Sequence, residues 1–170
     1  EVYLYAKLCQ ARKLHPFVGD AYMGKWGDRD AQLVTSKDYW LKRLKGLPGY
    51  DWHKAGILLA TEGPNGMTIE KHTGTYYTKG AQQLIGGWAE VSVNGVVSYH
   101  DVGLDEFNKN KSTWKAMPAI MIRKVALAQL IRDVVPEEFA GMYIEEELPM
   151  RDVSSSQAGD SVQELRDKIS

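Results

Sequence analysis

The sequence predicts an α+β domain with a mostly antiparallel sheet, and three observations carry this prediction. Residues 118–135 form a long apolar stretch with helical periodicity that a proline opens and Pro136 ends. Asn94-Gly95 separates two β-like segments, which is the strongest hairpin signal in the chain. The predicted elements follow the order helix, strands, helix, hairpin, helix, which is typical of this fold class.

The first third of the chain predicts two helices with two short strands between them. Apolar residues recur at helical spacing from residue 2 to 9, and this helix is expected to stop before Pro16, because a residue that precedes proline avoids the α region. DAYMGK and AQLVT predict strands on either side of the turn-rich WGDRD. In SKDYWLKRLKG, Ser36 is a good N-cap and Gly46 is a good C-terminal stop.

The middle of the chain predicts two hairpins. After LPGYD (47–51), which we expect to be a loop, the segments GILLA (56–60) and MTIEKH (67–72) predict strands around a Gly-Pro-Asn-Gly turn. WAEVSV (88–93) and VVSYHDV (96–102) predict the strands that flank Asn94-Gly95.

Bulk composition bounds the class of protein. A length of 170 residues suffices for one domain with its own core. The single cysteine, Cys9, excludes an internal disulfide, fits a reducing cytosol and is expected to be buried. No apolar run approaches the roughly 20 residues of a membrane-spanning helix, and no signal peptide is visible.

Positive and negative charges are separated along the chain, although the net charge is only −1. Residues 107–132 contain no acid, and their six bases are Lys109, Lys111, Lys115, Arg123, Lys124 and Arg132. Residues 137–167 contain nine acids and two bases. Phosphate binding needs only a local basic surface, so this asymmetry is more informative than the net charge.

The helix predicted from Pro118 carries cations within an apolar surface. At about 100° per residue, its apolar side chains cover most of the circumference, so the helix is expected to be central. An unpaired buried cation is costly, so Arg123, Lys124 and Arg132 must reach solvent, an acid or a ligand. Pairing with acids such as Asp133 is one alternative, and a phosphate-binding surface shared with the upstream lysines is the other.

Trp114 lies among these lysines and also allows two interpretations. An aromatic ring interleaved with lysines suits stacking on the bases or sugars of an unpaired strand. Alternatively, Trp114 is a core anchor at the base of the long helix, because tryptophan is usually largely buried.

Catalytic motifs are missing from the sequence. It contains no GxxxxGK[ST] phosphate loop and no GxSxG motif, and its four histidines lack metal-ligand spacing. Acids such as Asp28, Asp51 and Asp101 could supply a metal-dependent nuclease site, but most of the acids lie in predicted turns or strand ends. We therefore expect no enzyme, no catalytic residue, no metal and no cofactor.

The stretch from Trp114 to Glu147 contains a tryptophan before a proline, a Met-Ile-Arg-Lys-Val-Ala helix, an acidic Pro-Glu-Glu turn, Gly-Met-Tyr and a short acidic run. In this pattern it resembles the RecT/lambda Bet (Redβ) family of phage single-strand annealing proteins. LHPFVGDAY, KDYW, GYDWHKAGI and GGWAEVSVNG are similar to earlier motifs of the family and follow its order. The resemblance covers most of residues 1–148.

This resemblance implies a Rad52-like annealing fold and ATP-independent annealing of complementary strands in phage-type homologous recombination. The implied ligands are single-stranded DNA and the annealed duplex. The implied partners are further copies of the chain in a ring or helical filament, a phage exonuclease and a host single-strand-binding protein. A phage- or prophage-encoded protein in the cytoplasm of a bacterial host, with no membrane partner, is expected.

The expected DNA contacts come from the basic run and from the first third of the chain. Ala119, Ile120 and Gly19 stand where the lambda member of the family has basic residues, so other cations are expected to supply part of the charge. The candidate residues are Arg123, Lys124, Arg132, Lys111, Lys115, Lys109, Trp114, Lys25 and Arg29.

We expect residues 1–148 to form the annealing core, and residues 149–170 to form a polar acidic extension within a fragment of a longer protein. One hypothesis is that this acidic tail contacts a neighbour's basic surface or shields it when DNA is absent. The alternative functions are another nucleic-acid-binding module without annealing activity, a metal-dependent nuclease, and a purely structural oligomer.

Overall fold

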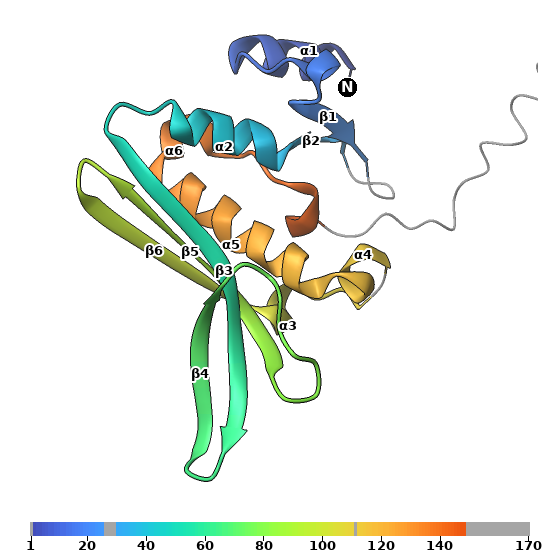
Figure 1. Cartoon of the computed structure of the whole chain (residues 1–170). Helices are drawn as coiled ribbons and strands as arrows, with labels where there is room; N and C mark the ends of the chain where they lie inside the picture. Colours follow the sequence, from blue (N-terminus) through green and yellow to red (C-terminus); the bar gives the residue numbers. More distant parts are fainter. Residues whose placement is uncertain (1, 26–29, 111, 149–170) are drawn as a thin grey trace, which may run out of the picture.

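The computed structural model describes residues 2–25, 30–110 and 112–148 (Figure 1). The strands are β1 (Ala21–Gly24), β2 (Gln32–Thr35), β3 (Tyr50–Gly63), β4 (Gly66–Thr73), β5 (Gln83–Val93) and β6 (Val96–Gly103). The α-helices are α1 (Val2–Ala11), α2 (Lys37–Lys45), α3 (Leu104–Phe107), α4 (Ser112–Ala116), α5 (Pro118–Val134) and α6 (Pro136–Phe139). Two 3₁₀ turns are η1 (Pro16–Val18) and η2 (Glu145–Glu147).

The strands form two antiparallel sheets. β4, β3, β5 and β6 lie side by side in that order, while β1 and β2 form a separate two-stranded ribbon. Every pairing between neighbouring strands is antiparallel. The sheet packs against helices, so the predicted α+β class is confirmed, and the architecture is consistent with a Rad52-like annealing fold.

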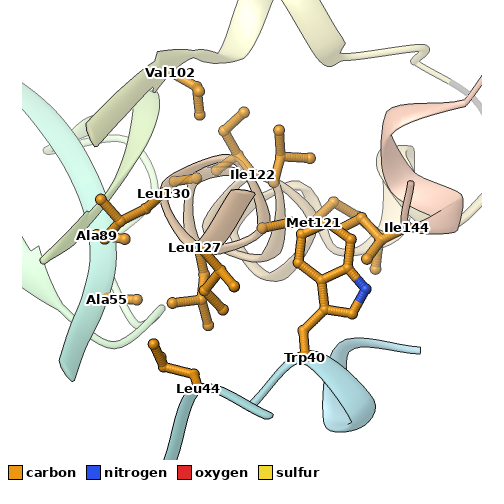
Figure 2. Close-up of a cluster of buried hydrophobic side chains, with 14 of the residues drawn as sticks. Trp40, Leu44, Ala55, Ala89, Val102, Met121, Ile122, Leu127, Leu130 and Ile144 are labelled. Atoms are coloured by element: carbon orange, nitrogen blue, oxygen red, sulfur yellow. The ribbon is translucent and has the colours of Figure 1, made fainter. Parts of the chain in front are cut away.

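Helix α5 is the centre of the core. Its 17 residues pack across β5, β6 and β3, and α2 contacts it from another side (Figure 1). Figure 2 shows that buried side chains surround α5 on three sides. The sheet contributes Ala55, Ala89 and Val102, α2 contributes Trp40 and Leu44, and the segment after α6 contributes Ile144. Each fully buried leucine or isoleucine in this cluster stabilises the fold by roughly 1.5–3 kcal/mol.

Local sequence signals set the ends of several elements as expected. Ser36 caps α2 by accepting a hydrogen bond from the Tyr39 backbone nitrogen at 3.2 Å, and Gly46 follows the last turn. Asn94 and Gly95 both adopt positive φ angles, 52° and 76°, in the turn between β5 and β6. A two-residue hairpin turn needs this left-handed geometry, which asparagine and glycine tolerate best.

Strand β3 begins earlier than the sequence predicts. Tyr50 and Asp51, which belong to the expected loop 47–51, are part of the strand. Tyr50 pairs with Val93, and the Asp51 carboxylate accepts hydrogen bonds from the Ser92 hydroxyl at 2.7 Å and from the Gly95 nitrogen at 2.9 Å. These contacts with the second hairpin override the local turn preference of the Pro-Gly-Tyr-Asp segment.

The described helices include none with the length and apolarity needed to cross a membrane.

The fit of α5 on the sheet depends on a close approach of the two backbones at Gly87 in β5. A Cβ atom at Gly87 would lie 2.5 Å from the Ile122 carbonyl oxygen and 2.8 Å from its carbon. Helix and strand therefore approach more closely here than any side chain allows.

Replacing Gly87 by alanine should force α5 away from β5 and lower the free energy of unfolding by about 2 kcal/mol. Urea unfolding followed by circular dichroism measures this loss. Gly63→Ala is the matched control, because the nearest atom would lie 3.7 Å from its Cβ. Equal unfolding midpoints for the two variants would show that the close approach does not limit the packing.

Candidate nucleic-acid interface

Arg123 projects from the first half of α5 towards β3. Its Nε donates a hydrogen bond to the Ala55 carbonyl oxygen at 3.1 Å, and the side chain is half-buried. This contact fixes the stem of the side chain. Within the described residues no carboxylate pairs with Arg123.

Lys124 lies one position further along α5 and stands between two acids. Its Nζ is 2.7 Å from a carboxylate oxygen of Glu146 in η2. It also acts electrostatically on Asp38 at the start of α2, whose carboxylate binds Lys37 at 2.8 Å. The hydrogen bond and charge of Lys37, followed by the charge of Lys124, lower the pKa of Asp38.

Helix α2 brings further cations to the same region. Lys45 is exposed and, together with Arg123, acts on the imidazole of His53 in β3. Burial lowers the pKa of His53, and the positive charges of Lys45 and Arg123 lower it further. The His53 Nδ1 atom lies 2.6 Å from the Tyr50 hydroxyl.

We define the basic face as Lys37, Lys45, Arg123 and Lys124, which come from α2 and α5. Sequence reasoning missed its α2 half because it followed the acid-free run from residue 107 onward. A signal was present, since the nine residues of α2 contain four bases and one acid. The fold places this helix against α5, which a count of charges along the chain cannot reveal.

Arg132 is held in a structural cluster. Its NH2 group donates to both carboxylate oxygens of Glu147 at 2.9 and 2.7 Å, and to the Met142 carbonyl oxygen at 3.2 Å. The guanidinium carbon lies 5.4 Å from the ring centre of Trp40 and 4.9 Å from that of Tyr143. The acid that pairs with Arg132 is thus Glu147, whereas Asp133 lies 3.3 Å from His100.

The other basic residues expected to contact DNA lie in different environments. Lys109 is half-buried and donates to the carbonyl oxygens of Glu146 and Leu148. Burial lowers the pKa of Lys109, while Glu146 and Glu145 act in the opposite direction. Lys115 on α4 and Lys25 after β1 are exposed. Arg29 and Lys111 lie outside the described residues, as does the acidic extension 149–170.

The two interpretations of Trp114 are resolved in favour of the core anchor. Its side chain is only 4% exposed and belongs to the main hydrophobic cluster. The ring therefore has no free face on which a base could stack in this structure. Trp114 lies in α4 directly before α5, where burying its ring fixes the approach to the long helix.

The basic face presents four cationic side chains. Within the described part of the chain, no cluster of three or more histidine, cysteine or acidic side chains could hold a metal ion. The face consists of three lysines, which act as mobile point charges, and one arginine, which presents a planar fork of donors. Such a set suits the repeating phosphates of a nucleic-acid backbone.

The sequence model of the RecT family matches residues 1–160. The chain therefore belongs to the RecT family, and the resemblance seen in its motifs is confirmed. Membership identifies a DNA-binding protein of recombination that acts in single-strand annealing, binds single-stranded DNA and self-oligomerises. No curated protein matches the chain.

Replacing Arg132 by alanine should lower the free energy of unfolding by about 3 kcal/mol, because the substitution leaves Glu147 buried without its counter-charge. Glu147 has a side chain only 5% exposed, so water cannot replace the lost partner. Urea denaturation measures the loss. Lys115→Ala is the control and should change stability by less than about 0.5 kcal/mol, as is usual for an exposed side chain. A near-neutral Arg132→Ala would contradict a structural role.

His53 should titrate below the ordinary histidine value of about 6.5, and Lys45→Ala should raise its midpoint by removing a repelling charge. The unfolded chain then takes up a proton at a higher pH than the folded one. Stability should therefore fall as the pH drops below about 6.5 through the lowered folded-state pKa. Histidine NMR resonances measure the midpoint, and Lys7→Ala on α1 should leave it unchanged.

Proposed function

We propose that the basic face binds the phosphate backbone of single-stranded DNA and that the protein pairs this strand with its complement without ATP. The observation that carries the proposal is the packing of α2 beside α5, which brings cations of the two helices together in pairs. Lys37 and Lys124 both act on Asp38, and Lys45 and Arg123 both act on His53. Two of these cations, Lys45 and Arg123, have no carboxylate partner among the described residues.

Annealing breaks and makes no covalent bond, so it requires positioning and charge neutralisation rather than a catalytic residue. Cations that bind phosphates reduce the repulsion between two approaching anionic strands. Backbone contacts carry no sequence information and leave the base edges free to pair. The complementary bases then supply both the specificity and the driving free energy.

The proposal of ATP independence is supported by the sequence, which contains no GxxxxGK[ST] loop. Each protomer offers few phosphate contacts, so self-oligomerisation would strengthen binding by multivalency. We further propose, from family membership, that an exonuclease generates the single strand and that a host single-strand-binding protein delivers it. A ring or a helical filament is the proposed form of the oligomer.

Wild-type protein should accelerate the pairing of two complementary fluorescent oligonucleotides without ATP, and Arg123→Ala and Lys45→Ala should each slow it about tenfold at physiological salt. Each substitution should also reduce the slope of log affinity against log salt by about 0.7, the value for one phosphate contact on a single strand. Stopped-flow fluorescence and anisotropy measure these quantities. Lys7→Ala removes an exposed charge from α1, and this control variant should keep the wild-type annealing rate and the wild-type affinity for DNA.

The rival functions give different results in the same assay. Tight binding of duplex DNA without acceleration of pairing would identify a nucleic-acid-binding module of another kind. Shortened products that disappear with EDTA would identify a metal-dependent nuclease. A salt-independent affinity would contradict any role for the basic face and leave a structural oligomer.

A further inference from the structure

The acidic turn η2 lies against the cations that were expected to contact DNA. Glu146 places a carboxylate oxygen 2.7 Å from the Nζ atom of Lys124. Lys109 donates to the carbonyl oxygens of Glu146, at 3.3 Å, and of Leu148. One short segment of the chain therefore supplies oxygen ligands to two of the lysines of the basic run.

This segment is held in place independently of Glu146. The Thr35 backbone nitrogen in β2 donates to the Tyr143 carbonyl oxygen at 3.0 Å, which ties the approach to η2 onto the β1–β2 ribbon. At the other end, Glu147 is bound by both Arg132 and the Ile144 nitrogen. Tyr143 and Glu147 thus anchor the segment, and Glu146 is presented between two fixed points.

Glu146 and Glu147 differ in their access to water. The Glu147 side chain is 5% exposed, while those of Glu146 and Lys124 are 15% and 25% exposed. The Arg132 guanidinium lies over the rings of Trp40 and Tyr143, whereas the pair of Glu146 and Lys124 includes a cation of the basic face. The second pair can therefore be opened by an incoming anion without exposing the first.

We propose that Glu146 is an internal competitor of the DNA backbone, which occupies Lys124 in the free protein and yields it to a phosphate when single-stranded DNA binds. This inference rests on the proposed role of the basic face. A carboxylate and a phosphate oxygen accept the same charge-assisted hydrogen bond from a lysine. Binding at Lys124 exchanges one ion pair for another, so this contact adds less affinity than a free lysine would.

Such an exchange suits a protein that must release its product. Each phosphate contact at Lys124 is balanced by a carboxylate that can return, and the paired duplex is therefore held less tightly. The exchange also changes the salt dependence of binding. When a phosphate takes Lys124 from Glu146, the freed carboxylate keeps a negative charge close to that phosphate, so the exchange displaces few of the cations condensed on the DNA.

The test compares Glu146→Gln with Glu145→Gln in the full chain. Both variants remove one negative charge and keep the side-chain shape, but Glu145 is exposed and has no ion pair among the described residues. Fluorescence anisotropy with a labelled thymidine oligonucleotide gives the affinity across a salt series. Glu146→Gln should bind about fivefold tighter at low salt, with a slope steeper by about 0.7. Glu145→Gln should remain within about twofold of wild type.

A double-mutant cycle identifies the lysine involved. Lys124→Ala alone and Lys124→Ala combined with Glu146→Gln should bind the oligonucleotide equally, because the competitor has lost its target. Glu146→Asp retracts the carboxylate by one methylene while keeping its charge, and should give an intermediate affinity. This variant also serves if Glu146→Gln fails to fold.

The outcomes separate this inference from the proposed function. Wild-type affinity in folded Glu146→Gln and Glu146→Asp would overturn the competitor role while leaving the basic face intact. An equal gain in Glu145→Gln would also overturn it, because the effect would then be one of net charge. If wild-type protein binds no oligonucleotide and Arg123→Ala changes nothing, the proposed function itself fails.

Discussion

The burial of α5 is the interaction on which the rest of the structure depends. The helix contacts β5, β6 and β3 on one side and α2 on another, and nine of its residues are buried. Because the helix is enclosed in this way, its cationic side chains can leave the core at only a few places. Each of them contacts a different neighbour. Arg123 reaches β3, Lys124 meets Glu146, and Arg132 meets Glu147. Packing geometry therefore decides which charges are structural and which remain accessible.

The parts of the fold set by local chemistry could be predicted from the sequence. The cap at Ser36, the turn at Asn94-Gly95 and the helix opened by Pro118 each depend on residues that are close in the chain. The early start of β3 at Tyr50 could not, because it depends on pairing with β5 some forty residues away. Local preference is a weak guide wherever a distant strand supplies the hydrogen bonds.

The candidate site was only partly predictable for a related reason. Arg123 and Lys124 were found because they interrupt an apolar helix, which is visible in the sequence. The contribution of Lys45 depends on α2 packing beside α5 and was missed. Trp114 was ambiguous, since the same residue pattern fits a stacking platform and a core anchor, and only its burial distinguishes them. The acids of η2 were noted as charges, but not as partners of Lys124 and Arg132.

Strand β3 changes neighbours along its length. Its first part pairs with β5, whereas Thr61, Glu62 and Gly63 pair with β4 alone, in a hairpin that projects from the sheet (Figure 1). Nearly every β4 side chain is exposed, so opening the tip uncovers little apolar surface. The stability of the core therefore depends little on the end of this hairpin. Its Gly-Pro-Asn-Gly turn is a natural position for an inserted peptide or a fluorescent label, since changes of length there do not reach α5.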